Sequence, residues 1–322
     1  MKELKIGQND AGQRLDRFLS KAVPLLPASL LQKYIRLKRI KKNGKKATRE
    51  EILQAGDILQ LYINDEFFDA PAADNAYLRI TAPKLDILYE DENILLIDKA
   101  PGIAVHDGDG LGSTLIDHVR AYLYQSGQWR PREEQSFSPA LCNRIDRNTG
   151  GIVIAAKNAQ SLRILNEKIK NREVEKRYLA ICEGSVPAQG RLIGYLTKDD
   201  RRNRVEICNQ PQEDAKYCET RYRLLEYRNG LSLVECALIT GRTHQIRAQF
   251  AHDGFPLLGD VKYGAKPCAH KYQALYAYHL AFRFTSDAGA LSYLHNREFR
   301  VKDVSFVADY FPNNMQSKPT EE

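Results

Sequence analysis

An acidic, alanine-rich stretch that contains Pro71 interrupts the chain at residues 65–82 and limits how the rest can fold. This composition is typical of a linker between domains. A chain of 322 residues is long enough for two domains, each with its own hydrophobic core. The sequence therefore predicts a domain, a linker, a second domain and a disordered tail, in the order 1–65, 66–82, 83–312 and 313–322.

Helical spacing of apolar residues opens the first domain. The residues that carry this spacing, before a helix end at Pro24, are Leu15, Phe18, Leu19 and Val23. Ser29 stands three residues before Gln32, a capping-box pattern that predicts Ser29 as the N-cap of a second helix. Asn43-Gly44 predicts a tight turn between two short strands.

Positive charge is concentrated in the same domain. Residues 33–49 hold nine Lys or Arg and no acid: Lys33, Arg36, Lys38, Arg39, Lys41, Lys42, Lys45, Lys46 and Arg49. Such a run is either a solvated lysine-rich surface or a face that neutralises phosphates. Because the run spans a helix end and a hairpin, one face of the domain carries it. The net charge of +7 favours a polyanionic partner only weakly.

The second domain alternates strands, helices and turns. Apolar runs predict buried strands at 93–98, 152–157, 177–182 and 231–239. A helix is expected from Leu115 to near Gly127, and Asn158 is expected to cap another. Strands outnumber helices and several look linked by hairpins. We therefore expect an α+β fold with a mixed, largely antiparallel sheet flanked by helices.

Several kinds of site find no support in the sequence. The loop 106–113 is rich in Gly and Asp but fits neither phosphate-loop pattern nor an EF-hand. The seven histidines are not at metal-site spacing, so no metal and no cofactor are expected. The six scattered cysteines suggest free thiols in a reducing cytoplasm. No signal peptide or membrane-spanning apolar run is evident.

Asp146 is the residue that points to chemistry. It lies between Arg144 and Arg147 and is followed by a turn and the apolar run 152–156. Neighbouring cations keep a carboxylate ionised, and an ionised aspartate at the end of a strand can act as a nucleophile. The local sequence alone favours a structural aspartate, either neutralised by Arg144 or Arg147 or capping a turn.

Two further segments favour a catalytic role for Asp146. Residues 240–247 place Arg242, His244 and Arg247 just after a predicted strand. Tyr178 follows two cations at the start of another strand. Together these side chains would supply an ion-pair partner, a stacking ring and phosphate contacts for Asp146 and its substrate.

These segments resemble the motifs of the RluA-type pseudouridine synthases. The resemblance runs in order through 144–151, 175–180 and 240–247 to Gly259-Asp260 and Tyr263-Gly264, and 89–102 is similar to the opening strand and turn of that family. The first domain resembles the S-four-like (alpha-L) RNA-binding module, through 14–19, the basic helix, Asn43-Gly44 and Gly56-Asp57. The layout is similar to the branch that modifies ribosomal RNA.

The resemblance implies a cofactor-free isomerisation of uridine to pseudouridine in structured RNA. Asp146 would be the catalytic aspartate, as nucleophile or as proton acceptor, with Arg247 as its ion-pair partner and Tyr178 stacked on the uracil. Arg144 would enter the RNA where the extruded base has left. The RNA contacts are expected from Arg144, Arg147, Arg242 and His244, and in the first domain from Lys33, Arg36, Lys38 and Arg39.

The chain departs from the family pattern near the expected site. Asn143 stands in place of a histidine, Gly150 in place of a serine in the turn, and Tyr276 in place of a later histidine. These changes concern substrate choice more than activity. Ribosomal RNA is the expected partner of a monomeric enzyme. The alternatives are tRNA as the substrate, a non-catalytic RNA-binding or ribosome-assembly factor, or an unrelated enzyme of glycosidic bonds.

Overall fold

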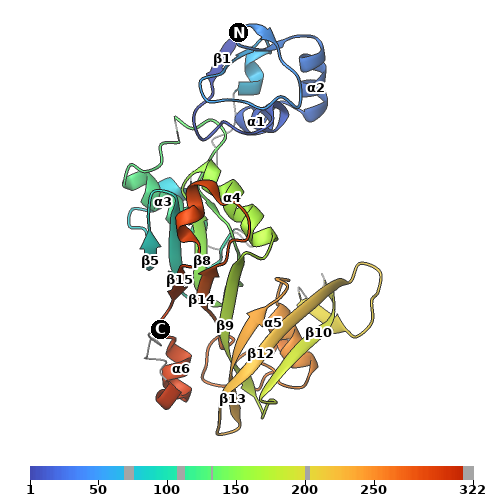
Figure 1. Cartoon of the computed structure of the whole chain (residues 1–322), viewed down its shortest axis with the longest axis vertical. Helices are drawn as coiled ribbons and strands as arrows, with labels where there is room; N and C mark the ends of the chain where they lie inside the picture. Colours follow the sequence, from blue (N-terminus) through green and yellow to red (C-terminus); the bar gives the residue numbers. More distant parts are fainter. Residues whose placement is uncertain (69–75, 107–112, 132, 200–203, 315–322) are drawn as a thin grey trace.

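The computed structural model describes residues 1–68, 76–106, 113–131, 133–199 and 204–314. A small N-terminal domain is joined to a larger domain built on one long sheet (Figure 1). The expected α+β architecture is therefore confirmed. Within the described residues, no helix is long and apolar enough to cross a bilayer.

The N-terminal domain packs two helices on a four-stranded sheet with the order β1-β4-β2-β3. Phe18 and Leu19 of the first helix are fully enclosed in its core, as their spacing predicts. The elements are β1 (Lys2–Lys5), α1 (Leu15–Ala22), α2 (Ala28–Arg36), β2 (Ile40–Lys42), β3 (Lys45–Lys46) and β4 (Ile58–Leu61).

The second helix begins earlier than expected. The prediction of Ser29 as its N-cap is wrong, because α2 starts at Ala28 and its N-cap residue is Pro27, which makes no side-chain cap bond. The ring of Pro27 fixes its φ angle near the value that the N-cap position needs, so the helix can begin without a hydroxyl cap. Asn43 and Gly44 do form the predicted turn, with positive φ angles of 52° and 76° that suit a two-residue hairpin.

In the described part of the larger domain, the sheet has 11 strands in the order β11-β10-β12-β13-β9-β14-β8-β6-β5, with β15 beside β14 and β7 beside β8. All its ladders are antiparallel except β8 with β14. The strands are β5 (Ile87–Glu90), β6 (Ile94–Lys99), β7 (Ala140–Leu141), β8 (Gly150–Ala156), β9 (Val174–Glu183), β10 (Gln189–Asp199), β11 (Arg204–Cys208), β12 (Lys216–Arg228), β13 (Leu231–Leu238), β14 (Leu275–Phe282) and β15 (Glu298–Arg300).

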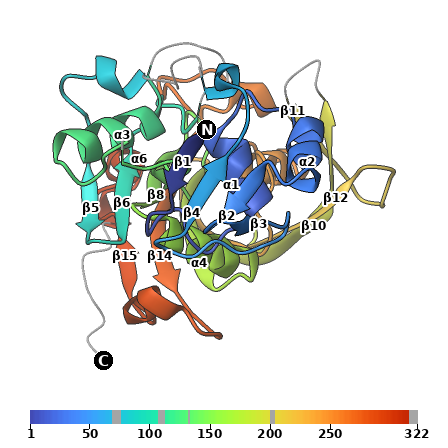
Figure 2. The same ribbon diagram turned by 90° about the horizontal axis from the view of Figure 1, so that it is seen from above.

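Helices cover both faces of this sheet. One face, called here the α5 face, packs on α3 (Leu115–Gln125) and α5 (Gln245–His252). The other, the α4 face, packs on α4 (Ala159–Lys170), the 3-10 helix η4 (Gly289–Leu294) and α6 (Ser305–Tyr310). Figure 2, seen from above, shows α3 and α4 on different sides of β8. Asn158 caps α4 as predicted, since its side chain accepts a bond from the Ser161 amide.

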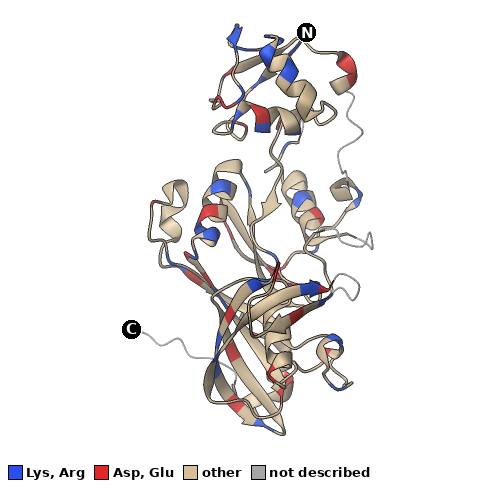
Figure 3. Cartoon of the chain, turned by 90° about the vertical axis from the view of Figure 1, so that its right-hand side faces the viewer, with Lys and Arg blue, Asp and Glu red and all other residues tan. Residues whose placement is uncertain are grey.

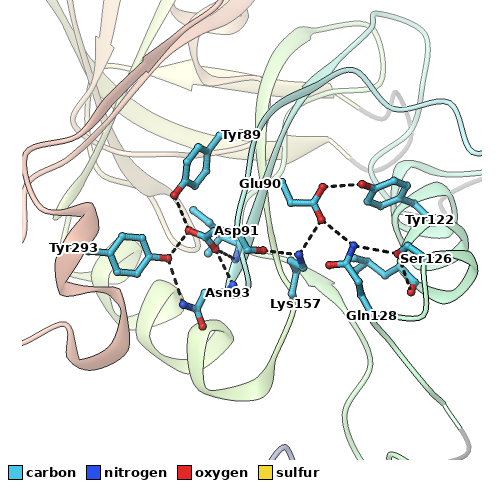
Figure 4. A network of polar contacts seen from close by, with 11 residues as sticks. Tyr89, Glu90, Asp91, Asn93, Tyr122, Ser126, Gln128, Lys157 and Tyr293 are labelled. Atoms are coloured by element: carbon cyan, nitrogen blue, oxygen red, sulfur yellow. Dashed lines mark hydrogen bonds and ion pairs between the residues drawn. The ribbon is translucent and has the colours of Figure 1, made fainter.

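A polar network ties the first strands of this sheet to its helices (Figure 4). Lys157, just after β8, donates to Glu90 at 2.8 Å and to the carbonyl of Asp91. Glu90 also accepts the Tyr122 hydroxyl of α3 at 2.7 Å, and Asp91 accepts the Tyr293 hydroxyl of η4 at 2.5 Å. The turn between β5 and β6 is therefore fixed from both faces.

The stretch expected to be a linker contains two short 3-10 helices, η1 (Asp65–Phe68) and η2 (Ala76–Arg79). Tyr77 is buried against Trp129, with ring centroids 5.1 Å apart, so η2 packs on the larger domain. At the other end, η5 (Pro312–Asn314) extends the ordered chain into the expected tail, whose residues 315–322 lie outside the described part.

The two domains touch through polar groups. Asp10, which is 1% exposed, accepts both the amide of Ser136 at 2.9 Å and its hydroxyl at 2.7 Å. Asn9 donates to Glu134 at 2.6 Å and accepts the Ala159 amide at the start of α4 at 3.1 Å. These contacts fix the N-terminal domain beside α4.

Candidate active site

A cleft of about 980 Å³ opens on the α5 face of the sheet. The loop between β7 and β8 forms one wall, and α5 with the ends of β10 and β11 forms the other. Six of the residues singled out in the sequence line it: Arg144, Asp146, Tyr178, Arg242, His244 and Arg247.

The backbone of the β7–β8 loop is held from below. The Thr149 amide donates to the Asp146 carbonyl at 3.0 Å and closes a turn. The next carbonyl, that of Arg147, accepts the Gly102 amide and the Lys99 ammonium, both at 2.9 Å. The Asp146 side chain is left 21% exposed and points into the cleft.

Lys99 clamps three stretches of backbone together. Its Nζ donates to the carbonyls of Ala100, Ile103 and Arg147, each at 2.9 Å. Three acceptors match the three hydrogens of an ammonium group, so this geometry belongs to the charged form. Burial lowers the pKa of Lys99 to about 7, against the opposing pull of Asp146 and Asp98.

Arg247 of α5 joins Asp146 to a second carboxylate. Its Nη1 donates to Asp146 Oδ2 at 2.9 Å, while Nε and Nη2 donate to Asp260 at 2.7 and 2.9 Å. Burial by itself would lower the pKa of Arg247, but the hydrogen bonds and charges of Asp260 and Asp146 raise it. The guanidinium is therefore charged, fixed and aimed at Asp146.

The role of Asp260 was not found by reasoning from the sequence. The residue stands in the Gly259-Asp260 motif, yet nothing local marks it as a partner of Arg247. Only an indirect argument could have found Asp260. A buried guanidinium has five hydrogen-bond donors, so Arg247 needs a second acceptor besides the partly exposed Asp146. The sequence did not indicate the role of Lys99 either, because its hydrogen-bond partners are backbone carbonyls.

Tyr178 and His244 complete the wall around Asp146. Burial and the charge of Asp146 raise the pKa of Tyr178, so its phenol stays protonated at neutral pH. His244 Nε2 lies 3.8 Å from Asp146 Oδ2, and its Nδ1 lies 2.9 Å from the Tyr263 hydroxyl. Burial lowers the pKa of His244 to about 4, although Asp146 opposes this, so the ring is neutral at pH 7.

The remaining candidates for RNA contact fall into three groups. Arg144 and Arg242 are exposed at the cleft, where phosphates can reach them. Arg147 does not line the cleft, and its carbonyl is the group that the site uses. The four from the first domain are exposed on α2 and the turn after it, and the structure does not bring them to the cleft: Lys33, Arg36, Lys38 and Arg39.

The departures from the family pattern have structural counterparts. Asn143 pairs with β8, where it accepts the Ile154 amide at 2.8 Å. Gly150 leaves room for the ring of Tyr276: a Cβ atom on Gly150 would lie 2.3 Å from Tyr276 Cε2. The Tyr276 hydroxyl then donates to Asp98 at 2.7 Å. Two of the departures are therefore in contact behind the β7–β8 loop.

A carboxylate fixed by a buried arginine, beside a tyrosine and in a cleft lined by further cations, suits a nucleophile that acts on an anionic substrate. Comparison with known proteins agrees. The family model described as RNA pseudouridylate synthase matches residues 93–252.

Relatives of known name cover most of the chain. A ribosomal large subunit pseudouridine synthase C of Escherichia coli (strain K12) is 33% identical over 82% of this chain and 80% of its own length. The protein of the same name from Haemophilus influenzae is 32% identical over 83% and 80%. An uncharacterized RNA pseudouridine synthase of Mycoplasma genitalium is 32% identical over 86% and 88%.

Solved structures share the fold. Human RNA Pseudouridylate Synthase Domain Containing 4 matches with a TM-score of 0.53 and 22% identity, over 72% of this chain and 91% of that one. The chain therefore belongs to the RNA pseudouridylate synthase family, and it is an isomerase, an RNA pseudouridine synthase.

Proposed function

We propose that this enzyme isomerises specific uridines of large-subunit ribosomal RNA and that Asp146 is its catalytic residue. The ion pair between Asp146 and Arg247, at 2.9 Å inside the cleft, is the observation that carries the proposal. Relatives named for the ribosomal large subunit, matched over four fifths of their length, support the choice of RNA.

The reaction replaces one glycosidic bond by another and transfers one proton. The N1–C1′ bond of uridine breaks, the uracil turns within the cleft, and a C5–C1′ bond forms. The C5 proton is lost and N1 gains one, so no atom is added. Asp146 either attacks C1′ or removes a proton from the neighbouring sugar carbon, and both routes need it ionised.

The other residues act around Asp146. Arg247 donates to the Asp146 carboxylate and keeps it aimed, since the position of Arg247 is itself fixed by Asp260. Tyr178 stacks on the uracil, and its protonated hydroxyl can exchange hydrogen bonds with the turning base. The base reaches them only when it has left the RNA helix, and Arg144 at the cleft fills the space that it leaves.

The test measures tritium release from RNA labelled at carbon 5 of uracil, because this hydrogen leaves only when the new bond forms. We expect Asp146→Asn to lose activity on large-subunit ribosomal RNA by about 10⁴-fold or more, with RNA binding retained. Asp303→Asn, an exposed position outside the cleft, is the matched control. Release within tenfold of wild type would exclude Asp146, and release from tRNA alone would exclude ribosomal RNA.

A further inference from the structure

The α4 face of the sheet carries the same cluster of side chains three times. In the first copy, Glu219 accepts Arg191 at 3.0 Å, Arg221 at 3.3 Å and the Tyr217 hydroxyl at 2.7 Å. One carboxylate is thus surrounded by two guanidinium groups and one neutral aromatic donor. The site of the proposed reaction uses none of these residues.

The second copy is centred on Glu235 of β13. It accepts Arg177 at 3.2 Å, Arg223 at 3.0 Å and the hydroxyl of Tyr278.

The third copy is centred on Glu298 of β15. It contacts Arg300 at 3.2 Å, the His279 ring at 3.0 Å and the guanidinium of Arg283. Each copy has two cationic groups and one anion.

Strand register joins the copies into one line, called here the arginine row. The row follows Cα partners on six neighbouring strands: Arg191, Arg221, Ala237, Arg177, His279 and Arg300. The remaining arginines of the clusters, Arg223 and Arg283, are counted as part of the row. Five intervals of about 4.8 Å give the row a length of about 24 Å. Blue and red segments alternate on the strands in the lower part of Figure 3.

The two signs of charge lie at different depths. The side chains of Glu219 and Glu235 are each 7% exposed, whereas those of Arg191, Arg221 and Arg223 are 58%, 59% and 58% exposed. In these two copies the carboxylates therefore hold the arginines from beneath, and the outer layer that a partner meets is cationic. In the third copy Glu298 is 33% exposed, beside Arg283 at 35% and Arg300 at 58%. Side chains fixed in this way lose little freedom when they bind.

The row faces away from the cleft. Neighbouring residues of a strand point to opposite faces, and Tyr178 lines the cleft, so Arg177 points to the other side. In the same way Tyr222 packs on Phe250 of α5, which directs Arg221 outward. The row begins on β10, next to the edge strand β11, and both of these strands also line the cleft.

We propose that the arginine row binds the phosphate backbone of a second segment of RNA, on the sheet face opposite the cleft. Guanidinium groups bind phosphates through paired hydrogen bonds. Tyr217, which is 40% exposed beside Glu219, offers a ring on which a base can stack. An acidic protein fits less well, because protein interfaces have an apolar centre and this layer consists of guanidinium groups. The inference rests on the proposed function only in taking RNA as the partner.

The test removes one arginine from each cluster, so that every glutamate keeps a cationic partner. The variant is Arg191→Gln with Arg223→Gln and Arg300→Gln. The matched control removes three exposed cations around α3, as Arg79→Gln, Lys84→Gln and Arg130→Gln. The dissociation constant for large-subunit ribosomal RNA is measured from low to high salt. We expect the slope of log Kd against log salt to fall by about 2 in the row variant, at roughly 0.7 per single-strand contact, and to stay unchanged in the control.

A second measurement does not depend on charge. Ile193, 47% exposed on the same face, is replaced by a photo-crosslinking amino acid, and Leu78, 51% exposed on η2, serves as control. We expect RNA crosslinks from position 193 only. Equal slopes in the two triple variants, or crosslinks from 193 to protein and not to RNA, would overturn the proposal. Tritium release by the wild-type enzyme at saturating RNA separates the two proposals. If the wild-type enzyme releases no tritium, the proposed function fails, whereas the salt slopes still decide whether the arginine row binds RNA.

Discussion

At the scale of single residues, Arg247 divides its donors between two carboxylates of different exposure. Asp146 is 21% exposed and open to substrate, whereas Asp260 is 2% exposed and fully committed to Arg247. Asp260 thus acts through Arg247, as a positioning residue. A charged partner beneath the arginine lets Asp146 change its own charge or bonding without releasing the guanidinium.

We expect Asp260→Asn to lower kcat by about 10- to 100-fold, because it removes one charge-assisted hydrogen bond worth about 1.5–3 kcal/mol. The Kd for RNA should stay near that of wild type. Single-turnover tritium release and filter binding give the two values. Since a variant that merely loosens the fold would weaken binding as well, a parallel loss in both values would contradict the positioning role.

Gly150 and Tyr276 make the second residue-scale prediction. A side chain on Gly150 must displace the Tyr276 ring, since the two would be 2.3 Å apart. We expect Gly150→Ser to cost about 1–3 kcal/mol of unfolding free energy through overpacking. Adding Tyr276→Ala should recover part of that cost, as measured by urea denaturation. Tyr276→Phe is the control for the lost hydrogen bond to Asp98. If the losses of unfolding free energy caused by Gly150→Ser and Tyr276→Ala simply add in the double variant, the two positions are independent.

Much of the residue-scale site could be predicted. Asp146, Tyr178 and Arg247 stand in ordered motifs, and the structure brings them to one cleft. Lys99 and Asp260 could not be assigned, because their partners are chosen by the packing of distant segments. Hydrogen bonds to carbonyl groups leave no trace in residue types, so the clamp made by Lys99 is visible only in three dimensions.

At the scale of elements, a buried ion pair joins α4, β9 and the turn after β14. Lys168, in the last turn of α4, donates to Glu173 at 3.0 Å and to the Ser286 carbonyl at 2.7 Å. Glu173 also accepts the Thr285 amide at 2.8 Å. Burial raises the pKa of Glu173, but these hydrogen bonds outweigh it and lower the pKa to about 2.

This pair predicts an acid-sensitive part of the stability. The folded pKa of Glu173 is below its ordinary value of 4.5, so the unfolded chain binds the proton more readily. The contribution is therefore complete above pH 4.5 and is lost as pH falls towards 2. We expect the difference in unfolding free energy between wild type and Glu173→Gln to be larger at pH 7 than at pH 3. A difference that does not change with pH would contradict this account.

Element prediction succeeded where one face of an element is apolar. The strand β8 and the cap of α4 were predicted from an apolar run and an asparagine. The long strand β12 was not, because charged residues are spread along it and leave no continuous apolar run. The order of strands could not be predicted at all, since no local pattern says that β14 lies between β8 and β9.

At the scale of the whole molecule, the N-terminal domain is held by a few polar contacts. We expect Asp10→Ala to loosen it, because the Ser136 amide loses its partner at a cost of about 1–3 kcal/mol. Small-angle X-ray scattering should report a larger radius of gyration. The kcat on a short RNA fragment should not change, since Asp10 is remote from the cleft lining. An unchanged radius of gyration would show that other contacts are enough to hold the N-terminal domain in place.

The basic run of the same domain gives a prediction for RNA affinity. We expect Lys38→Glu with Arg39→Glu to weaken RNA binding and to lower the salt slope by about 1.5, because two phosphate contacts are lost. Both side chains are exposed, so folding should be unaffected. Charge reversal at Arg79 and Arg130 is the matched control. An unchanged slope would exclude this face from RNA binding.

The place of β14 in the sheet also sets when the enzyme can begin to act. In the described residues β8 and β9 share no ladder, and β14 (Leu275–Phe282) fills the space between them. A ribosome that makes 5–20 residues per second needs roughly 5–20 s to pass from the end of β9 to the end of β14. Until then, no strand pairs β9, which carries Tyr178, with β8, which follows the loop that carries Asp146. The nascent chain can complete its N-terminal domain early, but the cleft can form only after β14 has been synthesised.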